Sequence, residues 1–563
     1  MAVLATINSG KTTDSTMNER YFEMFQLGLA AQLKELSLDE VVLYVRNHLH
    51  NFLLDESLAL CFFERLANDP LSAGHEPARK AILYLMDKAL QIRPFRPGLL
   101  QAVVRLTGNP QVKKRLEIVE ECNQDKATYD LISALNLKSD AEDAREFIAQ
   151  LLKAHPGHLA AAQYALHVDR HFGTVPGPWL AGFSCPAPAL RDWEIHLFNH
   201  YASICAYEQA MPLWPTLNKT LLREISFNLA AEMFIAAGDT ARGLALYAKS
   251  IKQDPRQVPV RLRMRELENP FAPDRSQLDR HTVNICLYSW NKADMLGQTL
   301  ASLSRSDIGR ARIDILLNGC TDHSREVVDT ARALFPNNEF TVHDLHVNIG
   351  APAARNWLKE LPEVRACEYI AFLDDDVTVQ EDWLAAFLTV AETDPKIAVV
   401  GCKTLHPGDP ALIQYLYRYV AIADHGLFRM SINAPEHQYD THVYDFTRET
   451  RNVMGCLHLL RTSALREIKA GFDIRFSPSQ VDDIDHDVCL CLAGYTIMYC
   501  GQVACVHHQS SGTNSTKEGL KPDNVGSIMG NDIKLYFKHA DHLEKLKALD
   551  NLSLDIGIEP PEI

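Results

Sequence analysis

The feature that most constrains this chain is a regular alternation of two kinds of segment in its second half. Short runs rich in β-branched and aromatic residues alternate with runs of helical periodicity such as ADMLGQTLASL and EDWLAAFLTVAE. The β-rich runs are VNICLYS, RIDILL, EFTVHDL, CEYIAFL and IAVVGC. Strands that alternate with helices build βαβ units and a mostly parallel sheet. We therefore predict a Rossmann-like α/β domain whose ligand binds at the carboxyl ends of the strands.

Residues 17–267 have a different pattern, in which apolar residues recur at intervals of three and four. Segment 226–255 predicts two helices around a turn at Gly238–Asp239. Small residues would let these helices approach closely: Ala230, Ala237, Ala241 and Ala245. The unit resembles a tetratricopeptide repeat, whose helix pairs stack into arrays with a concave surface. We expect an all-α, tetratricopeptide-like domain that binds a protein partner, although an irregular helical domain would show the same periodicity.

The remaining segments set the expected boundaries. Residues 1–16 are expected to be a flexible terminus, and 268–280, ENPFAPDRSQLDR, contains two prolines and several charges typical of a linker. The α/β domain is expected to cover 281–512. Residues 513–563 begin with a loop rich in Gly, Ser and Asn and end in a helix. That loop is compatible with a lid over a ligand and equally with a plain connector.

The charge and the apolar content exclude several classes of function. The formal net charge is −16, which argues against a nucleic-acid-binding surface but not against a nucleotide whose phosphates a metal ion neutralises. No apolar run approaches eighteen residues, so we expect no membrane span. The first twenty residues lack a basic region followed by a long apolar segment, so we expect no signal peptide. The 13 cysteines lie mostly in apolar runs without regular spacing, as expected of buried thiols. A cytoplasmic protein is the resulting expectation.

An acidic cluster ends one of the predicted strands. In YIAFLDDDVTV (369–379), the carboxylates of Asp374, Asp375 and Asp376 follow a buried run with no basic residue nearby in the sequence. Burying such charges costs several kcal/mol each unless a positive partner compensates. Mg²⁺ and Mn²⁺ prefer hard oxygen ligands. A divalent cation is therefore the predicted partner of this cluster.

Further polar segments surround the acidic cluster in the chain order. They are LYSWNK (287–292), LLNGCTDHS (316–324), NIGAPAARN (348–356), VMGCLHLLR (453–461), DDID (482–485) and VHHQSSG (506–512). Each alone is compatible with a turn, a helix cap or a solvated helix start. In this order and spacing, together with LDDD, they resemble the inverting glycosyltransferases of family 2, which have the GT-A fold. The resemblance covers about residues 281–512.

The resemblance implies a donor and a set of site residues. The donor would be a nucleotide-diphosphate sugar carrying UDP, GDP or dTDP. The residues implied in binding it are Ser289, Asn291, Asn318, Asp322, Asn348, Arg355, Asp374 and Asp375. Arg355 is the basic side chain expected to balance the phosphates. The implied ligands of the metal are Asp374, Asp376 and His508, with His507 as the alternative histidine.

An inverting transfer needs a base near the acceptor hydroxyl, and a carboxylate whose pKa is raised by neighbouring acids suits this role. Asp483, the second residue of DDID, matches the catalytic base of the family. Asp482 stands where the family usually has Glu, so it is the alternative base.

We therefore expect a metal-dependent inverting glycosyltransferase that acts on a hydroxyl of a protein or glycan acceptor. The Gln-x-x-Arg-Trp box of processive membrane synthases is missing, since QYLYRY (414–419) has the wrong spacing and no Trp. A catalytically inactive helical-repeat scaffold is one alternative. A nucleotidyltransferase is another, but it should have a glycine-rich loop after its first strand, and SWNKADM has no glycine. A zinc site at Cys505 lacks a second Cys or His pair at proper spacing.

Overall fold

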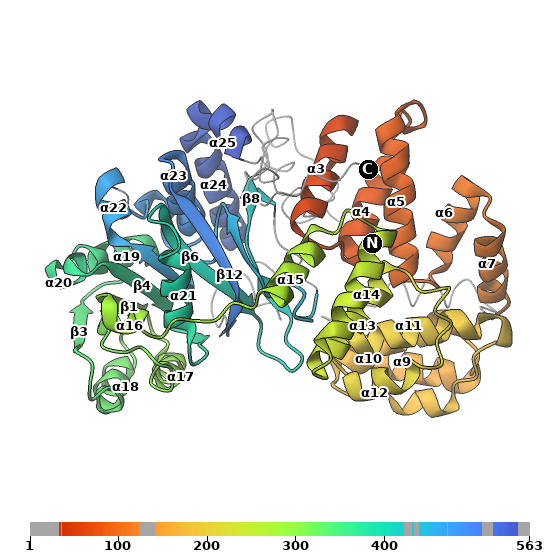
Figure 1. Ribbon diagram of the computed structural model, residues 1–563, viewed down its shortest axis with the longest axis horizontal. Coiled ribbons are helices and arrows are strands. Elements are labelled where there is room, and N and C mark those ends of the chain that lie inside the picture. The colour runs from red at the N-terminus through yellow and green to blue at the C-terminus, as the bar shows by residue number, and fades with distance from the viewer. Residues whose placement is uncertain are drawn as a thin grey trace.

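The computed structural model describes residues 33–34, 36–122, 141–420, 431–432, 438–469, 471–508 and 522–549. The chain forms two parts that lie side by side, a helical part on the right of Figure 1 and a sheet flanked by helices on the left. The segments expected to be a flexible terminus (1–16) and a lid loop or connector (513–521) lie outside the described residues.

The described residues of the amino-terminal part form helices joined by short connections, as the apolar periodicity predicts. Its helices are α3 (Leu38–Asn51), α4 (Glu56–Ala67), α5 (Glu76–Ile92), α6 (Pro97–Thr107), α7 (Pro110–Cys122), α9 (Ala141–Ala154), α10 (Leu159–His171), α11 (Leu190–Ser203), α12 (Tyr207–Leu213), α13 (Glu224–Ala236), α14 (Thr240–Gln253) and α15 (Val258–Glu268). The short helix α16 (Gln277–Arg280) lies in the segment expected to be a linker. Whether the helix pairs form a true tetratricopeptide array stays a prediction.

Helices α13 and α14 form the helix pair expected from segment 226–255. Asp239 caps α14 by accepting a hydrogen bond from the backbone N–H of Arg242 at 3.1 Å. The expectation about small residues was partly wrong, because Ala237, Ala241 and Ala245 are exposed and only Ala230 is buried. The close approach occurs instead at Gly243, where an added Cβ would lie 2.4 Å from Ile235 Cγ1. The helical phase places Gly243, and not the exposed alanines, toward α13.

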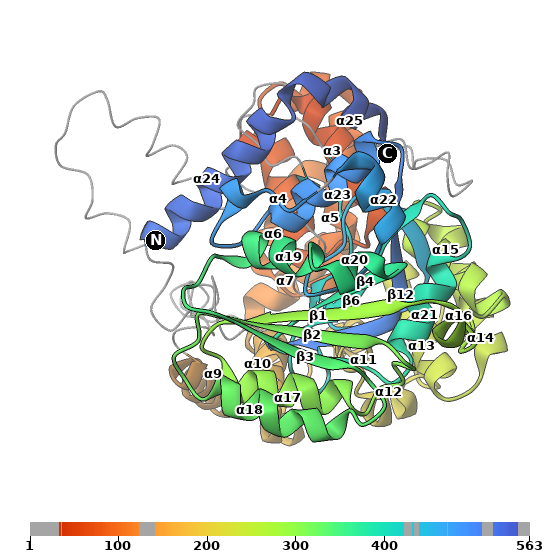
Figure 2. The same ribbon diagram turned by 90° about the vertical axis from the view of Figure 1, so that its left-hand side faces the viewer.

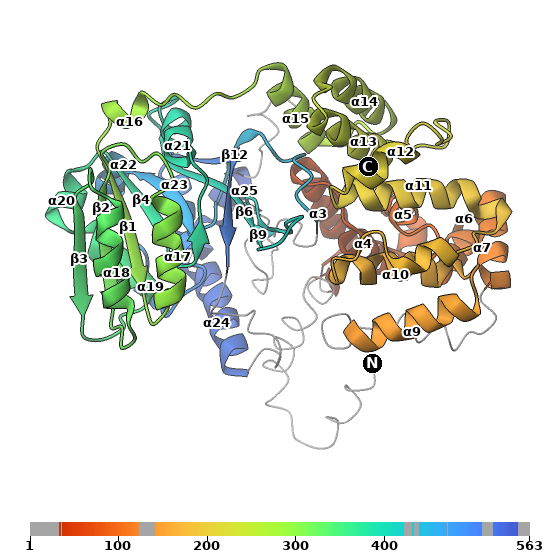
Figure 3. The same cartoon turned by 90° about the horizontal axis from the view of Figure 1, so that it is seen from below.

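The second part is built on one large sheet. Its strands are β1 (Val283–Ser289), β2 (Arg312–Asn318), β3 (Phe340–Leu345), β4 (Tyr369–Asp374), β5 (Val377–Thr378), β6 (Ile397–Leu405), β7 (Ile413–Tyr415), β10 (Thr447–Thr450), β11 (Leu457–Arg461) and β12 (Thr496–His507). The strand order is β10-β12-β6-β11-β4-β1-β2-β3, with β5 beside β12 and β7 beside β6. Strands β8 (Tyr419–Val420) and β9 (Ser431–Ile432) form a separate pair. Figure 3 shows β3 at the edge far from the helical part and β12 near it.

Helices cover both faces of this sheet (Figure 2). They are α17 (Ala293–Leu303), α18 (Ser324–Ala331), α19 (Ala351–Lys359), α20 (Pro362–Ala366), α21 (Trp383–Ala391), α22 (Thr462–Ile468) and α23 (Asp482–Leu492). Ile285 and Leu287 of β1 share an apolar cluster with α17 and α21, whereas Cys286 belongs to the cluster that includes α19. A strand buried on both faces reads as a continuous apolar run, which explains VNICLYS.

The predicted architecture, an α/β domain preceded by a helical domain, is confirmed, and its assignment to the GT-A type stays a prediction. The sheet is more mixed than a mostly parallel one. Strands β1, β2, β3 and β4 pair in parallel, but β11 lies antiparallel between β4 and β6. The antiparallel strand matters for the site, because it brings the start of β11 to the end of β4.

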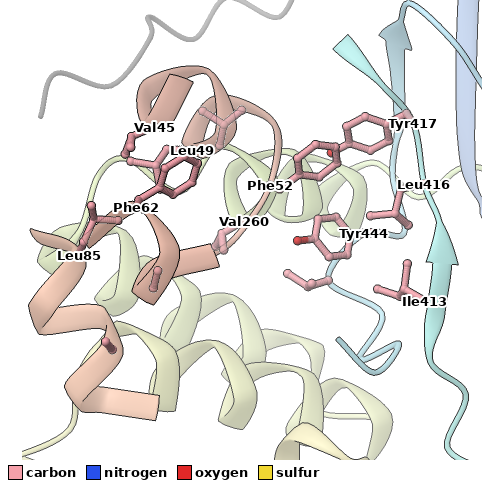
Figure 4. Packing of buried hydrophobic residues seen from close by; sticks show 14 of the residues in the cluster. Val45, Leu49, Phe52, Phe62, Leu85, Val260, Ile413, Leu416, Tyr417 and Tyr444 are labelled. Carbon is pink, nitrogen blue, oxygen red and sulfur yellow. The ribbon is translucent and has the colours of Figure 1, made fainter. Parts of the chain in front are cut away.

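The two parts share a continuous apolar core, which the linker-like sequence between them did not predict. Phe52, after α3, stacks on Tyr417 of the sheet part with 4.8 Å between the ring centroids. Figure 4 shows Phe52, Tyr417, Leu416, Ile413 and Tyr444 meeting across the junction. The Tyr444 hydroxyl accepts a hydrogen bond from the Leu53 backbone N–H at 3.0 Å. The helical part is therefore packed against the sheet part rather than tethered to it.

Two further helices, α24 (Pro522–Lys538) and α25 (Leu543–Leu549), follow the sheet. Leu535 and Leu546 share a small apolar cluster with Ile484 and Val488 of α23. The helix expected near the carboxyl end is therefore present and packs beside α23. Among the described helices, none has the combination of length and apolarity that crossing a membrane requires.

Candidate active site

The carboxyl ends of β1 and β4 and the start of β11 meet at one edge of the sheet. In the parallel pair of β1 and β4, Tyr288 lies opposite Asp374, and the Tyr288 hydroxyl donates to Asp374 Oδ1 at 3.0 Å. The backbone N–H of Asp374 donates to the Cys456 carbonyl, just before β11, at 2.8 Å. This edge therefore gathers the LYSWNK, LDDD and VMGC segments, as the parallel-sheet prediction requires.

A lysine that sequence reasoning missed neutralises part of the acidic cluster. Lys292 Nζ lies 3.1 Å from Asp375 Oδ1 and 2.8 Å from Asp376 Oδ2. Asp375 Oδ2 also accepts a 2.6 Å hydrogen bond from the Ser289 hydroxyl. The positive partner predicted for the aspartates was a divalent cation, and Lys292 was not predicted. Lys292 is the last residue of LYSWNK, so its position after the neighbouring strand was the available signal.

Asp375 and Asp376 are in different electrostatic states. Burial raises the pKa of Asp375 to about 6, although Lys292 and the Ser289 hydrogen bond oppose this rise. Burial also favours a higher pKa for Asp376, but hydrogen bonds and charge from His507 and Lys292 hold its pKa well below the usual range. Burial alone would lower the pKa of His507, but its hydrogen bond to Asp376 raises the pKa to about 9. Of these two carboxylates, Asp376 is therefore kept ionised more firmly than Asp375.

The described residues at this edge fit a divalent cation. One potential ligand atom from each of Asp374, Asp376 and His507 lies within 4.8 Å of the other two. Two carboxylates and one imidazole are a donor set that Mn²⁺ accepts. His508, the predicted ligand, does not join this group, since its Nε2 lies 2.9 Å from Thr378 Oγ1. The structure thus groups His507, the alternative in the sequence prediction, with the two aspartates.

Arg355 connects the acidic cluster to the DDID segment. Its guanidinium lies 2.6 Å from Asp482 Oδ2 and 3.4 Å from Asp374 Oδ1, and it donates to the Gly455 carbonyl at 3.1 Å. A Cβ on Gly455 would lie 3.1 Å from Arg355 Nη2 and 3.0 Å from Asp483 Cβ. Glycine at this position therefore leaves room for both side chains. Arg355 is buried and already paired with carboxylates, so balancing the phosphates of a donor stays a prediction.

The two candidate bases have distinct environments at the start of α23. Asp482 is buried and ion-paired with Arg355, and burial raises its pKa to about 6 against the opposing effect of Arg355. Asp483 is only half-buried, and its Oδ2 accepts a 3.0 Å hydrogen bond from the Gly455 backbone N–H. Asp483 therefore keeps a carboxylate accessible beside the acidic cluster, while Asp482 holds Arg355.

Asp485, the last acid of DDID, is bound by residues at the end of α24. Asp485 is fully buried, and its carboxylate lies 2.6 Å from Lys538 Nζ and 2.8 Å from His539 Nε2. These contacts join α23 to the end of α24. Asp485 also groups with Cys489 and His539 in a geometry that could hold an ion, but Lys538 already supplies a positive charge there.

The predicted nucleotide-binding residues on the neighbouring loops are bonded to one another. Asn318 Nδ2 donates to Asn348 Oδ1 at 2.9 Å, and Asn318 Oδ1 accepts from the Ile349 backbone at 3.0 Å. Asn291 Oδ1 accepts from the Thr321 N–H at 2.7 Å, and Asp322 Oδ2 accepts from the Ala293 N–H at 3.0 Å. These contacts join the loops after β1, β2 and β3. Their contribution to nucleotide binding stays a prediction.

A comparison with protein families supports the resemblance drawn from the motifs. Residues 284–469 match the family described as Glycosyl transferase family 2. A relative from Rhizobium meliloti (strain 1021), the succinoglycan biosynthesis protein ExoM, is 33% identical over 132 residues, which are 23% of this chain and 40% of that protein. The chain thus spans less than half the length of this curated relative. The resemblance is confirmed for the region of the sheet domain that the family covers.

Solved structures with a similar arrangement include two glycosyltransferases. GalNAc-T7 with UDP, GalNAc and Mn²⁺ is 13% identical, and the match covers 50% of this chain and 58% of that one with a TM-score of 0.36. The mannosyltransferase PcManGT of Pyrobaculum calidifontis, in complex with GDP-Man and Mn²⁺, is 17% identical, and the match covers 59% and 88% of the two chains with a TM-score of 0.32.

Proposed function

We propose, on the premise that residues 284–469 are a glycosyl transferase family 2 domain, that this chain is a metal-dependent inverting glycosyltransferase. It moves a sugar from a UDP-, GDP- or dTDP-sugar to a hydroxyl of a protein or glycan acceptor. The observation that carries the proposal is the arrangement at the sheet edge. There Asp374, Asp376 and His507 converge on one point, and Asp483 stands nearby, across the Arg355 side chain.

The residues divide the chemistry between them. When bound by Asp374, Asp376 and a histidine, Mn²⁺ or Mg²⁺ would stabilise the negative charge of the departing diphosphate. Asp483 accepts the proton of the acceptor hydroxyl while that oxygen attacks the anomeric carbon. The bond from this carbon to the diphosphate oxygen breaks on the opposite face, and the configuration inverts. Arg355 positions Asp482 and Asp374 relative to each other.

The acceptor of the sugar is proposed as a class, either a glycan or a protein, and the location as the cytoplasm. A relative named for succinoglycan biosynthesis favours a glycan acceptor. The helical domain favours a protein, either as acceptor or as partner, because stacked helix pairs present long surfaces. A cytoplasmic location would agree with the buried free thiols among the described cysteines, such as Cys402, Cys456 and Cys505.

The test is calorimetric titration of the full chain with a panel of UDP-, GDP- and dTDP-sugars, in Mn²⁺ and again in EDTA. We expect one nucleotide class to bind in Mn²⁺ and to lose most of its affinity in EDTA. Asp376→Asn should abolish the metal-dependent part. His507→Ala should weaken the metal-dependent binding of the donor. His508→Ala, the matched control on the next residue, should weaken this binding less.

The opposite outcomes are as informative. Binding that is equal in Mn²⁺ and EDTA would exclude the metal. No binding to any donor, with the protein folded, would favour the helical scaffold with an inactive transferase domain. A larger loss from His508→Ala than from His507→Ala would restore the assignment made from the sequence.

A further inference from the structure

A cavity of about 460 Å³ lies in the helical part, and none of its described lining residues belongs to the candidate active site. Helices α5, α10, α11 and α13 line it. From the sheet part, the segment that precedes β10 also lines it, through Gln438, Tyr439, Thr441 and Val443. Cavities of this size bind small organic molecules. The hydrogen-bonding groups that line the cavity therefore indicate which class of molecule it would accept.

The side-chain amide of Gln91, on α5, is held in one orientation. Its Nε2 donates to Glu224 Oε1 at 2.8 Å and to Asp87 Oδ2 at 3.0 Å. Carboxylates accept hydrogen bonds and do not donate them, so the amide cannot turn over without losing both bonds. Gln91 Oε1 is buried and has no hydrogen-bond partner among the described residues. The chain thus fixes one unpaired acceptor on a residue that lines the cavity.

The side-chain amide of Asn228, on α13, is fixed through Gln257. Gln257 Nε2 donates to Ser250 Oγ at 2.9 Å and to the Asp254 carbonyl at 3.0 Å. A carbonyl only accepts, so Gln257 Oε1 is left as the acceptor for Asn228 Nδ2, at 2.6 Å. Asn228 is 8% exposed, and its Oδ1 has no partner in the part of the chain that the structure describes. A second buried acceptor of fixed orientation therefore lines the cavity.

Helix α11 carries three more unpaired atoms on residues that line the cavity. Asn199 Oδ1, His196 Nε2 and His200 Nε2 have no hydrogen-bond partner within the described ranges. Their spacing of three and four places them on one helical face. His196 is 7% exposed and His200 is 9% exposed. Burial, with the charge of Arg93 contributing, lowers the pKa of His200 to about 3 and the pKa of His196 well below its usual range, so both imidazoles are neutral at pH 7.

These five atoms favour a ligand that donates hydrogen bonds and carries no charge. An unpaired buried polar group costs free energy, and three of the five atoms are amide oxygens, which only accept. An anionic group has no proton to donate to them. An ammonium group is disfavoured by the same burial and the same charge of Arg93 that keep the histidines unprotonated. A hydroxyl both donates and accepts, so several hydroxyls match the amide oxygens and either tautomer of the histidines.

The cavity also has an apolar lining. It is formed by Leu49 of α3, by Phe52, Leu53 and Leu54 after that helix, and by Ile225 and Leu229 of α13. We propose that this cavity binds a neutral carbohydrate. Its hydroxyls donate to Gln91 Oε1, Asn228 Oδ1 and Asn199 Oδ1, and the C–H groups of the sugar ring lie against the apolar side chains. This binding goes beyond the transferase activity and does not rest on it, because no nucleotide, metal or active-site residue takes part.

The test titrates the full chain with fluorescent 4-methylumbelliferyl glycosides, in EDTA and without nucleotide, and follows fluorescence polarisation. The neutral probes are the β-glucoside, the β-galactoside, the α-mannoside and the N-acetyl-β-glucosaminide, and the β-glucuronide adds a carboxylate to the ring. We expect at least one neutral glycoside to bind saturably, at one site per chain. The glucuronide and free 4-methylumbelliferone, which lacks the sugar, should bind more weakly. Asn199→Leu should weaken binding of the neutral glycoside roughly fivefold, since one neutral hydrogen bond is lost.

Deoxyfluoro analogues of the bound glycoside test whether the amide oxygens recognise its hydroxyls. In each analogue a fluorine replaces one hydroxyl, which nearly keeps the size and removes one donor. At one position this replacement should weaken binding to the unaltered chain roughly fivefold but have no further effect on Asn199→Leu, because both changes remove the same hydrogen bond. Gln91→Met should show the same behaviour at another position of the ring.

Gln150→Met is the matched control for Gln91→Met. Gln150 also donates to an acid one helical turn earlier, Glu146, at 3.0 Å, but it is exposed on α9 and does not line the cavity. Its substitution should leave the affinity for the glycoside unchanged. Circular dichroism checks the fold of each variant. Asn199 is only half-buried, so Asn199→Leu decides the test if Gln91→Met does not fold.

The proposal fails if no neutral glycoside binds saturably, or if the glucuronide or free 4-methylumbelliferone binds as tightly as the best neutral glycoside. It also fails if folded Asn199→Leu and Gln91→Met keep the original affinity. Failure of the nucleotide-sugar titration would leave these results unchanged, because the two experiments use different ligands and different residues.

Discussion

The two parts of this protein each bury a cluster of charges, and the clusters are balanced differently. In the helical part, Lys88 is paired with both Glu224 and Asp254, and Asp254 also accepts hydrogen bonds from Arg256 and Tyr84. At the sheet edge, the carboxylates of Asp374, Asp375, Asp376, Asp482 and Asp483 outnumber the cations Lys292, Arg355 and His507.

The difference separates a structural role from a binding role. Glu224 and Asp254 each accept a charged hydrogen bond from Lys88, which supplies a cation for both acids within the chain. The sheet-edge cluster has excess negative charge among its described residues and an accessible carboxylate on Asp483. Buried charge without full internal compensation marks a place where a cation or a reacting group binds. The following variants test this distinction, from the largest expected effect to the smallest.

Asp483→Asn should lower kcat by about 10²–10⁴-fold, because removing a general base costs roughly this factor. Donor binding and the free energy of unfolding should stay nearly unchanged, since the half-buried Asp483 is held mainly by a backbone hydrogen bond from Gly455. The measurements are steady-state kinetics, donor titration and urea unfolding. Asp482→Asn is the matched control. If it lowers kcat more than Asp483→Asn while remaining as stable, Asp482 is the base.

Lys88→Met should destabilise the protein by about 3–5 kcal/mol, because it leaves the carboxylates of Glu224 and Asp254 buried without their shared cation. Urea unfolding measures this loss. Lys80→Met removes a solvent-exposed pair with Glu76 on the same helix and should cost less than about 1 kcal/mol. A small effect of Lys88→Met, equal to that of Lys80→Met, would mean that the helical cluster is not the stabilising one.

Lys292→Met should destabilise the metal-free protein by about 1.5–3 kcal/mol, because Asp375 and Asp376 lose charged hydrogen bonds. Mn²⁺ should restore much of this stability, since a cation that binds the folded state raises its free energy of unfolding. Mn²⁺ should not restore the stability of Lys88→Met. Thermal unfolding with and without Mn²⁺ measures both, and equal behaviour of the two variants would remove the distinction between the clusters.

Acid should narrow the difference in stability between the unaltered protein and Lys88→Met. Burial alone would raise the pKa of Asp254, but Lys88 and Arg256 lower it to about 2. A folded-state pKa below the unfolded value contributes stability above the unfolded pKa, and this stability is lost as the pH falls toward the folded pKa. From the value near 2, about 1 kcal/mol of it should be lost between pH 7 and pH 3. Urea unfolding of both proteins across this range measures the gap, and a gap that widens at low pH would contradict the pairing.

Much of the fold and part of the candidate site could be predicted from the sequence. The β-rich runs form β1, β2, β3, β4 and β6. Strands β1, β4 and β6 are buried on both faces, which requires a continuous apolar run, whereas β3 is partly exposed. The positions of Asp374 and Ser289 at strand ends followed from the same pattern, since parallel strands end at one edge of a sheet. These inferences need only local periodicity.

The tertiary structure alone decided which partners meet. Side chains alternate along β12, so the strand directs His507 toward Asp376 and leaves His508 beside Thr378. Phe52 contacts Tyr417 and Lys292 contacts Asp376, although the two residues of each pair are far apart in the sequence. No local sequence pattern predicts contacts between such distant residues. Local periodicity determines which face of a helix or strand is buried and where that helix or strand ends. The packing of elements fixes which charges compensate one another, and this compensation separates the structural cluster from the candidate active site.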